Sequence, residues 1–79
     1  MVKAYIHIST NPGKMRDVLN ACLSIPGVVE GHMILGAYDI IIELEQDSVS
    51  NLMRIVEQKI HIIPGIRSTT TSVCFETGM

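Results

Sequence analysis

The sequence has no tryptophan, one phenylalanine and few charged side chains. Only 18% of its 79 residues are charged, and the six Lys and Arg residues are scattered, which argues against direct nucleic-acid binding. No apolar run approaches the roughly 18 residues of a membrane-spanning helix, and the N-terminal residues lack the pattern of a signal peptide. These absences predict a cytoplasmic protein with no direct contact with nucleic acid and none with a membrane.

Sequence motifs for metals, cofactors and catalysis are also missing. No Gly-rich phosphate-binding loop, CxxC pair or zinc-ligand spacing is present. Cys22 and Cys74 are most simply interpreted as small apolar side chains. Nucleophilic catalysis would need a Cys or Ser close to a histidine, and only His7, His32 and His61 are available. We therefore predict no catalytic residue, no metal site and no cofactor.

The chain is instead rich in apolar side chains for its size. Hydrophobic residues make up 47% of the sequence, and the mean hydropathy is +0.34. A domain this short buries only about 60–65% of its unfolded surface, so its own core is marginal. We therefore expect the excess apolar surface to meet another protein chain.

Two similar half-chains, each a strand, a helix and a strand, flank a central turn. Residues 2–9, 28–35, 40–45 and 66–75 have the pattern of strands. Two helical stripes lie between them: Met15, Val18, Leu19, Cys22 and Leu23, then Val49, Leu52, Met53, Val56 and Ile60. Asn11 followed by Pro12 is expected to cap the first helix, and Asp47 or Ser48 the second. Pro-Gly pairs at 26–27 and 64–65 end them.

The alternation within each strand predicts which side chains share a face. Val2, Ala4, Ile6 and Ile8 form the core face of the first strand, and Ile40, Ile42 and Leu44 that of the third. Simple alternation places Val28 on the same face of the second strand as Glu30 and His32. It also places Thr69 and Thr71 on the face opposite to Ile66.

The order strand-helix-strand-strand-helix-strand predicts an α+β, ferredoxin-like βαββαβ sandwich. Gly36 permits a positive φ in the turn, and so short a connection makes the middle strands an antiparallel hairpin. Both helices should cover one face of the sheet, leaving the other face with mixed apolar and polar side chains. Packing that face against a second copy would give a dimeric α/β-barrel.

The central turn is the best candidate for a ligand site. Gly36, Ala37, Tyr38 and Asp39 bring backbone groups, a phenol and a carboxylate together, a combination suited to a free amino acid. An ordinary structural turn is an equally simple interpretation. The hydroxyls at 69–71 could also contact a ligand, although β-branched residues are common in strands.

These motifs together resemble the effector-binding (RAM) domain of the Lrp/AsnC, or feast/famine, transcriptional regulators. The resemblance rests on Ile-Pro-Gly-Val at 25–28, Ile-Pro-Gly-Ile at 63–66, the turn at 36–39 and the threonines at 69–71, and it covers residues 1–76. It implies a domain that binds amino acids or related small molecules in clefts between dimers. It also implies dimers that assemble into octamers or similar rings.

The resemblance assigns the ligand contacts to Gly36, Ala37, Tyr38, Asp39, Thr69 and Thr71. At Ala37 many members carry an acidic or polar residue instead. Full members also carry an N-terminal helix-turn-helix domain, whereas residues 1–79 read as a single stand-alone effector-binding domain. Any effect on transcription would then pass through a partner such as a full-length regulator.

Two other functions fit the same fold. A small cofactor-free enzyme of the dimeric α/β-barrel type would use polar residues of the open face, here Tyr5, His7 or His32, around a cavity. An ACT-like amino-acid-binding domain would place its ligand near residues 11–13, after the first strand.

Overall fold

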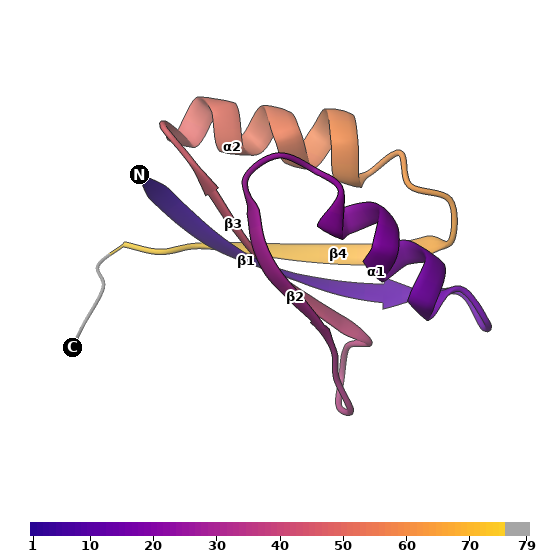
Figure 1. Ribbon diagram of the computed structural model, residues 1–79. Coiled ribbons are helices and arrows are strands. Elements are labelled where there is room, and N and C mark those ends of the chain that lie inside the picture. Colours follow the sequence, from indigo (N-terminus) through magenta and orange to yellow (C-terminus); the bar gives the residue numbers. More distant parts are fainter. Residues whose placement is uncertain (76–79) are drawn as a thin grey trace.

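A four-stranded antiparallel sheet with two helices on one face forms the core of the protein (Figure 1). The computed structural model describes residues 1–75; residues 76–79, part of the expected domain, lie outside the described residues. The elements are β1 (Val2–Thr10), α1 (Met15–Leu23), β2 (Val28–Met33), β3 (Ile40–Gln46), α2 (Val49–Ile55), the π-helix η1 (Val56–Ile60) and β4 (Ile66–Val73). The strand order β2-β3-β1-β4 confirms the ferredoxin-like βαββαβ fold.

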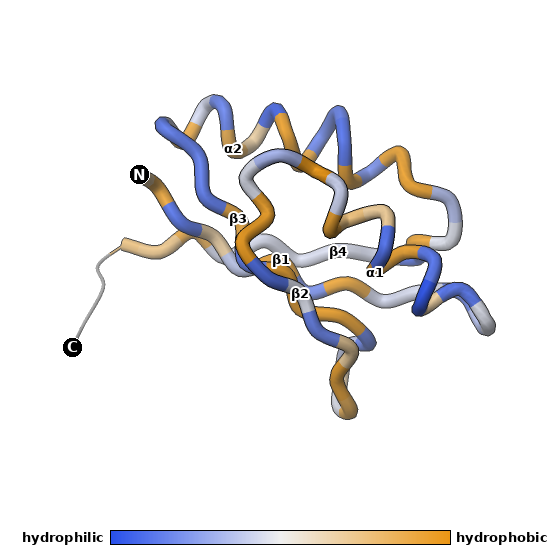
Figure 2. Tube along the Cα trace, viewed as in Figure 1, coloured by the Kyte–Doolittle hydropathy of each residue, from blue (hydrophilic) through white to orange (hydrophobic). Residues whose placement is uncertain are grey.

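The central strands β1 and β3 supply most of the core. Their alternate side chains have no exposed surface: Ala4, Ile6, Ile8, Ile40, Ile42 and Leu44. The helices cover them with Val18, Leu19, Cys22, Leu52, Val56 and Ile60. Burying each large aliphatic side chain stabilises the fold by about 1.5–3 kcal/mol. Figure 2 shows α2 alternating between apolar and polar residues, as expected for a helix with one buried face.

The two helices begin differently from each other. Ser48 caps α2 as expected, because its hydroxyl accepts a hydrogen bond from the Asn51 backbone N–H at 3.1 Å. The predicted cap of α1 at Asn11 is wrong, since α1 starts only at Met15. Gly13 has a φ of 81°, which belongs to a turn and not to a right-handed helix.

The outer edges of both predicted helical stripes are exposed. Leu23, Val49 and Met53 are 47%, 51% and 45% exposed, so these three are not core residues. The first helix ends at Leu23 and the second, continued by η1, at Ile60, in each case a few residues before the expected Pro-Gly pair. Gly27 and Gly65 in these pairs have positive φ values of 97° and 99°. No helix within residues 1–75 is long and apolar enough to cross a membrane.

Two β-bulges change which side chains share a face. In β2, Val28 pairs with Leu44 but Glu30 pairs with Glu43, so one residue of β2 is skipped. Val28 therefore lies on the helix-covered face, and its predicted position beside Glu30 is wrong.

The second bulge lies where β1 meets β4. Ser9 pairs with Ser68 and Thr10 with Ile66, so Ile66 faces the helices and packs against the core. Simple alternation had placed it on the opposite face. Strand lengths also differ from the prediction: β2 ends at Met33 instead of residue 35, and β4 at Val73 instead of residue 75.

One face of the sheet is left without a helix in the described chain. We call it the open sheet face, and the strand registers assign it Lys3, Tyr5, His7, Ser9, Glu30, His32, Ile41, Glu43, Glu45, Ser68, Thr70 and Ser72. Both helices lie on the other face, as predicted (Figure 1).

Candidate functional site

The turn between β2 and β3 is closed by backbone hydrogen bonds at its base. The Ile34 N–H donates to the Asp39 carbonyl at 2.8 Å, and the Asp39 N–H donates to the Ile8 carbonyl at 2.9 Å. The turn is therefore fastened to β1 as well as to its own hairpin. Gly36 is not among the positive-φ glycines, so the turn does not use the left-handed conformation that glycine permits there, and Gly36 and Ala37 are exposed at the tip.

The Asp39 side chain holds the end of β1. Its Oδ2 accepts hydrogen bonds from the Thr10 backbone N–H at 2.8 Å and from the Thr10 hydroxyl at 3.2 Å. Thr10 is 7% exposed, so this pairing satisfies a buried N–H group. Asp39 has a structural role within the subunit, whatever it contributes to a ligand.

Tyr38 extends across the open sheet face from the turn to the far edge strand. Its ring centroid lies 5.2 Å from that of His7 on β1, at an interplanar angle of 48°. Its hydroxyl forms a 3.0 Å hydrogen bond with the Thr70 hydroxyl on β4. The sequence prediction missed His7 and Thr70 as neighbours of Tyr38, although their alternation pattern places both on this face.

Thr69 and Thr71 lie on the opposite, helix-covered face. They pair with Ile8 and Ile6, whose side chains are fully buried beneath the helices. The Thr69 hydroxyl forms a 3.0 Å hydrogen bond with Nε2 of His61, which follows η1. The six expected ligand residues are thus divided within one subunit: Tyr38 is on one face of the sheet, and Thr69 and Thr71 are on the other.

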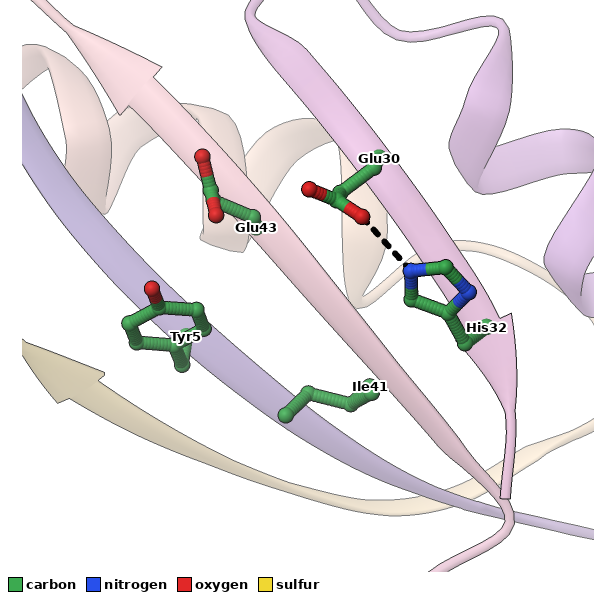
Figure 3. A pocket seen from close by; sticks show the side chains of 5 residues that line it. All are labelled: Tyr5, Glu30, His32, Ile41 and Glu43. Atoms are coloured by element: carbon green, nitrogen blue, oxygen red, sulfur yellow. Dashed lines mark hydrogen bonds and ion pairs between the residues drawn. The ribbon is translucent and has the colours of Figure 1, made fainter.

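A hollow of about 250 Å³ lies on the open sheet face. Figure 3 shows the five side chains that line it: Tyr5, Glu30, His32, Ile41 and Glu43. Nε2 of His32 lies 2.7 Å from Oε2 of Glu30. Glu30 is also the direct cross-strand neighbour of Glu43, so two carboxylates face the same hollow.

Among the residues that the structure describes, Lys3 is the only Lys or Arg that the strand registers place on the open sheet face. Its Nζ lies 3.6 Å from Oε2 of Glu43 and 4.0 Å from Oε2 of Glu45. The Glu43 carboxylate is the main reason that the pKa of Lys3 is raised above its ordinary value. Lys3 therefore stays protonated and offsets part of the acidic charge at this end of the sheet.

Metal and thiol chemistry have little support in the described residues. Within residues 1–75, no group of three or more His, Cys, Asp or Glu side chains could hold a metal ion. Burial raises the pKa of the Cys22 thiol to about 11, which keeps it protonated and unreactive at neutral pH.

Comparison with known proteins identifies the family of this chain. A family model described as the Lrp/AsnC ligand binding domain matches residues 3–78. The chain belongs to the Lrp/AsnC family. An uncharacterised HTH-type transcriptional regulator of Pyrococcus abyssi is 34% identical over a 77-residue alignment that covers 94% of this chain. The chain spans only 51% of that regulator's length.

Solved structures share the fold of this Lrp/AsnC domain along nearly its whole length. FFRP-DM1 is 35% identical with a TM-score of 0.91, and the match covers 95% of this chain and 100% of that one. E. coli AsnC is 25% identical with a TM-score of 0.92, covering 99% of this chain and 53% of AsnC. The Lrp/AsnC family and the HTH-type relative from Pyrococcus abyssi are transcriptional regulators and not enzymes, so the enzyme alternative is set aside.

Proposed function

We propose that this Lrp/AsnC domain binds an amino acid or a related small molecule at an interface between subunits. The division of the expected contacts is the observation that carries the proposal. Tyr38 lies on the open sheet face, and Thr69 and Thr71 lie on the helix-covered face. A ligand resting on one face of one subunit reaches only one of these sets, so a site using both is completed by a neighbouring subunit.

The open sheet face is the proposed surface for pairing two copies. It presents apolar surface from Ile41 and the rings of Tyr5 and Tyr38, together with polar side chains. Packing two such faces together would remove this surface from water and enlarge the core of a small domain. Further assembly of the dimers into an octamer or similar ring would bring the turns and β4 strands of different dimers together.

The proposed mechanism is a shift among assemblies. A ligand that binds between subunits favours whichever oligomer forms its cleft, because it has no comparable site in the others. The effect on transcription would pass through a helix-turn-helix regulator of the same family in a mixed assembly. The site of action is then the cytoplasm, where such regulators meet both DNA and free amino acids.

Native mass spectrometry with each of the twenty amino acids tests this proposal. We expect one of them to bind at a stoichiometry tied to the number of subunits and to shift the oligomer. Thr71→Val removes a hydroxyl while keeping the shape of the side chain, and Tyr38→Phe removes the phenol oxygen. Each should weaken binding about tenfold, as loss of one hydrogen bond predicts.

Glu57→Gln provides the control, because Glu57 is exposed on η1 and belongs to neither set. Its ligand affinity should equal that of the wild type. A fixed dimer that binds none of the twenty amino acids would contradict the proposal, as would unchanged affinity in both hydroxyl variants.

A further inference from the structure

The open sheet face carries a net negative charge. That face carries Glu30, Glu43 and Glu45 against Lys3, which gives a net charge of −2 with neutral histidines. The whole chain also has a formal net charge of −2, so the remaining acidic and basic residues balance in number. The surface proposed for pairing is therefore acidic.

The acidic side chains are only partly neutralised within the subunit. Lys3 is shared between Glu43 and Glu45, at 3.6 and 4.0 Å. Glu30 and Glu43 are direct cross-strand neighbours, and like charges in such positions repel each other. Figure 3 shows both carboxylates on the same side of the sheet, beside the hollow.

The hollow between these carboxylates has the features of a receptor for a long cationic side chain. Ile41 and the ring of Tyr5 provide an apolar wall against which the methylene stem of a lysine or arginine could pack. Glu30, which also contacts His32, and Glu43, which also contacts Lys3, would then face the cationic group, and the Tyr5 ring could add a cation–π contact. The volume of about 250 Å³ is ample for one such side chain.

We infer that the preferred partner of the open sheet face is another Lrp/AsnC-type domain whose corresponding face is basic. Two copies of this chain bring like net charges together, whereas a basic sheet face complements them and supplies side chains for the hollow. Mixed pairs should therefore form in preference to self-pairs. The inference rests on the sheet-to-sheet pairing of the proposed function and names the chemistry of the partner.

A charge-reversed copy of the chain serves as the probe partner. Glu30→Lys together with Glu45→Lys changes the net charge of the open sheet face from −2 to +2 and leaves the partly buried Glu43 in place. In an equimolar mixture with the wild type, native mass spectrometry should show mixed pairs well above the half expected from random mixing. The matched control is Asp17→Lys with Glu57→Lys, which makes the same change at exposed helix positions and should mix at random.

Salt dependence of the wild type tests the inference without any substitution. Raising NaCl from low to high concentration should tighten self-pairing roughly threefold, because screening removes like-charge repulsion.

A single substitution tests the same repulsion. Glu30 is exposed, and Glu30→Gln removes its charge with little change in size. This variant should pair with itself more tightly than the wild type at low salt, and its pairing should depend less on salt.

The outcomes separate this inference from the proposed function. Random mixing with the charge-reversed copy, or wild-type pairs that weaken as salt rises, would overturn the inference while leaving sheet-to-sheet pairing in place. If neither the wild type nor the mixture forms pairs, both the inference and the proposed pairing fail.

Discussion

Replacing Asp39 with alanine should destabilise the fold strongly, although Asp39 lies in a surface turn. The substitution removes the acceptor of the Thr10 N–H, at 2.8 Å, and of the Thr10 hydroxyl, at 3.2 Å. Because Thr10 is 7% exposed, its N–H would be left without a partner in a buried position. A hydrogen bond to a charged group contributes about 1.5–3 kcal/mol and a further hydroxyl bond about 1 kcal/mol. We therefore expect Asp39→Ala to lower the free energy of unfolding by about 2–4 kcal/mol.

Urea denaturation followed by circular dichroism measures this loss. Protein concentration must be the same for all variants, since subunit association adds to the apparent stability. Asp39→Asn keeps one oxygen acceptor and should lose less than Asp39→Ala. Glu57→Ala, at an exposed position, should change the free energy of unfolding by no more than about 0.5 kcal/mol. If Asp39→Ala costs as little as this control, the structural role assigned to the Asp39 carboxylate is refuted.

Three further substitutions test the packing, the helix cap and the buried thiol. Gly31→Ala should cost about 1–3 kcal/mol in urea denaturation, because the new Cβ would lie 2.6 Å from Cδ1 of Ile42. Ser48→Ala should lower stability by about 1 kcal/mol through loss of the α2 cap, and an unchanged melting temperature would contradict this. Burial raises the pKa of the Cys22 thiol from the ordinary 9.0 to about 11, so the thiol ionises at lower pH in the unfolded chain than in the folded one. The stability that the protonated thiol contributes is fully present below pH 9 and is lost as the pH rises through 11. Cys22→Ala should remove that part of the alkaline loss in urea midpoints measured across this range.

The fold could be predicted because the core depends on simple periodicities. Alternation in β1 and β3 predicted the six fully buried strand residues, and the spacing along the helices predicted most of the side chains that cover them. Each Pro-Gly pair follows a helix end by a few residues, so the pairs correctly indicated that both helices stop there. These features depend on residues that are close together in the chain, so contacts between distant residues did not change them.

The errors came from single residues that interrupt a period. Gly13 adopts a turn conformation that delays the start of α1, so the Asn-Pro pair before it caps nothing. The bulges in β2 and between β1 and β4 each shift one strand by a residue, which reverses the faces of Val28 and Ile66. A bulge depends on the pairing of two strands far apart in the chain, and one strand's sequence does not reveal it.

For a related reason, the sequence predicted only part of the candidate site. A motif names residue types in order, but contacts depend on which face each residue occupies. The motif includes Thr69 and Thr71, whereas the hydroxyl that meets Tyr38 within the subunit is that of Thr70. The role of Asp39 was also hidden, because its partner Thr10 lies 29 residues away in the chain.

These contacts make Thr70 a test of where the ligand binds. Thr70→Val breaks its hydrogen bond with Tyr38 on the open sheet face, whereas Thr71→Val changes only the helix-covered face. If sheet pairing and ligand binding use separate interfaces, Thr70→Val should alter the dimer dissociation constant and Thr71→Val the ligand affinity. Each variant should leave the other property near the wild-type value, as measured by native mass spectrometry. If one substitution changed both properties equally, a single interface would have to serve both functions, and the ligand would then lie between the two sheets.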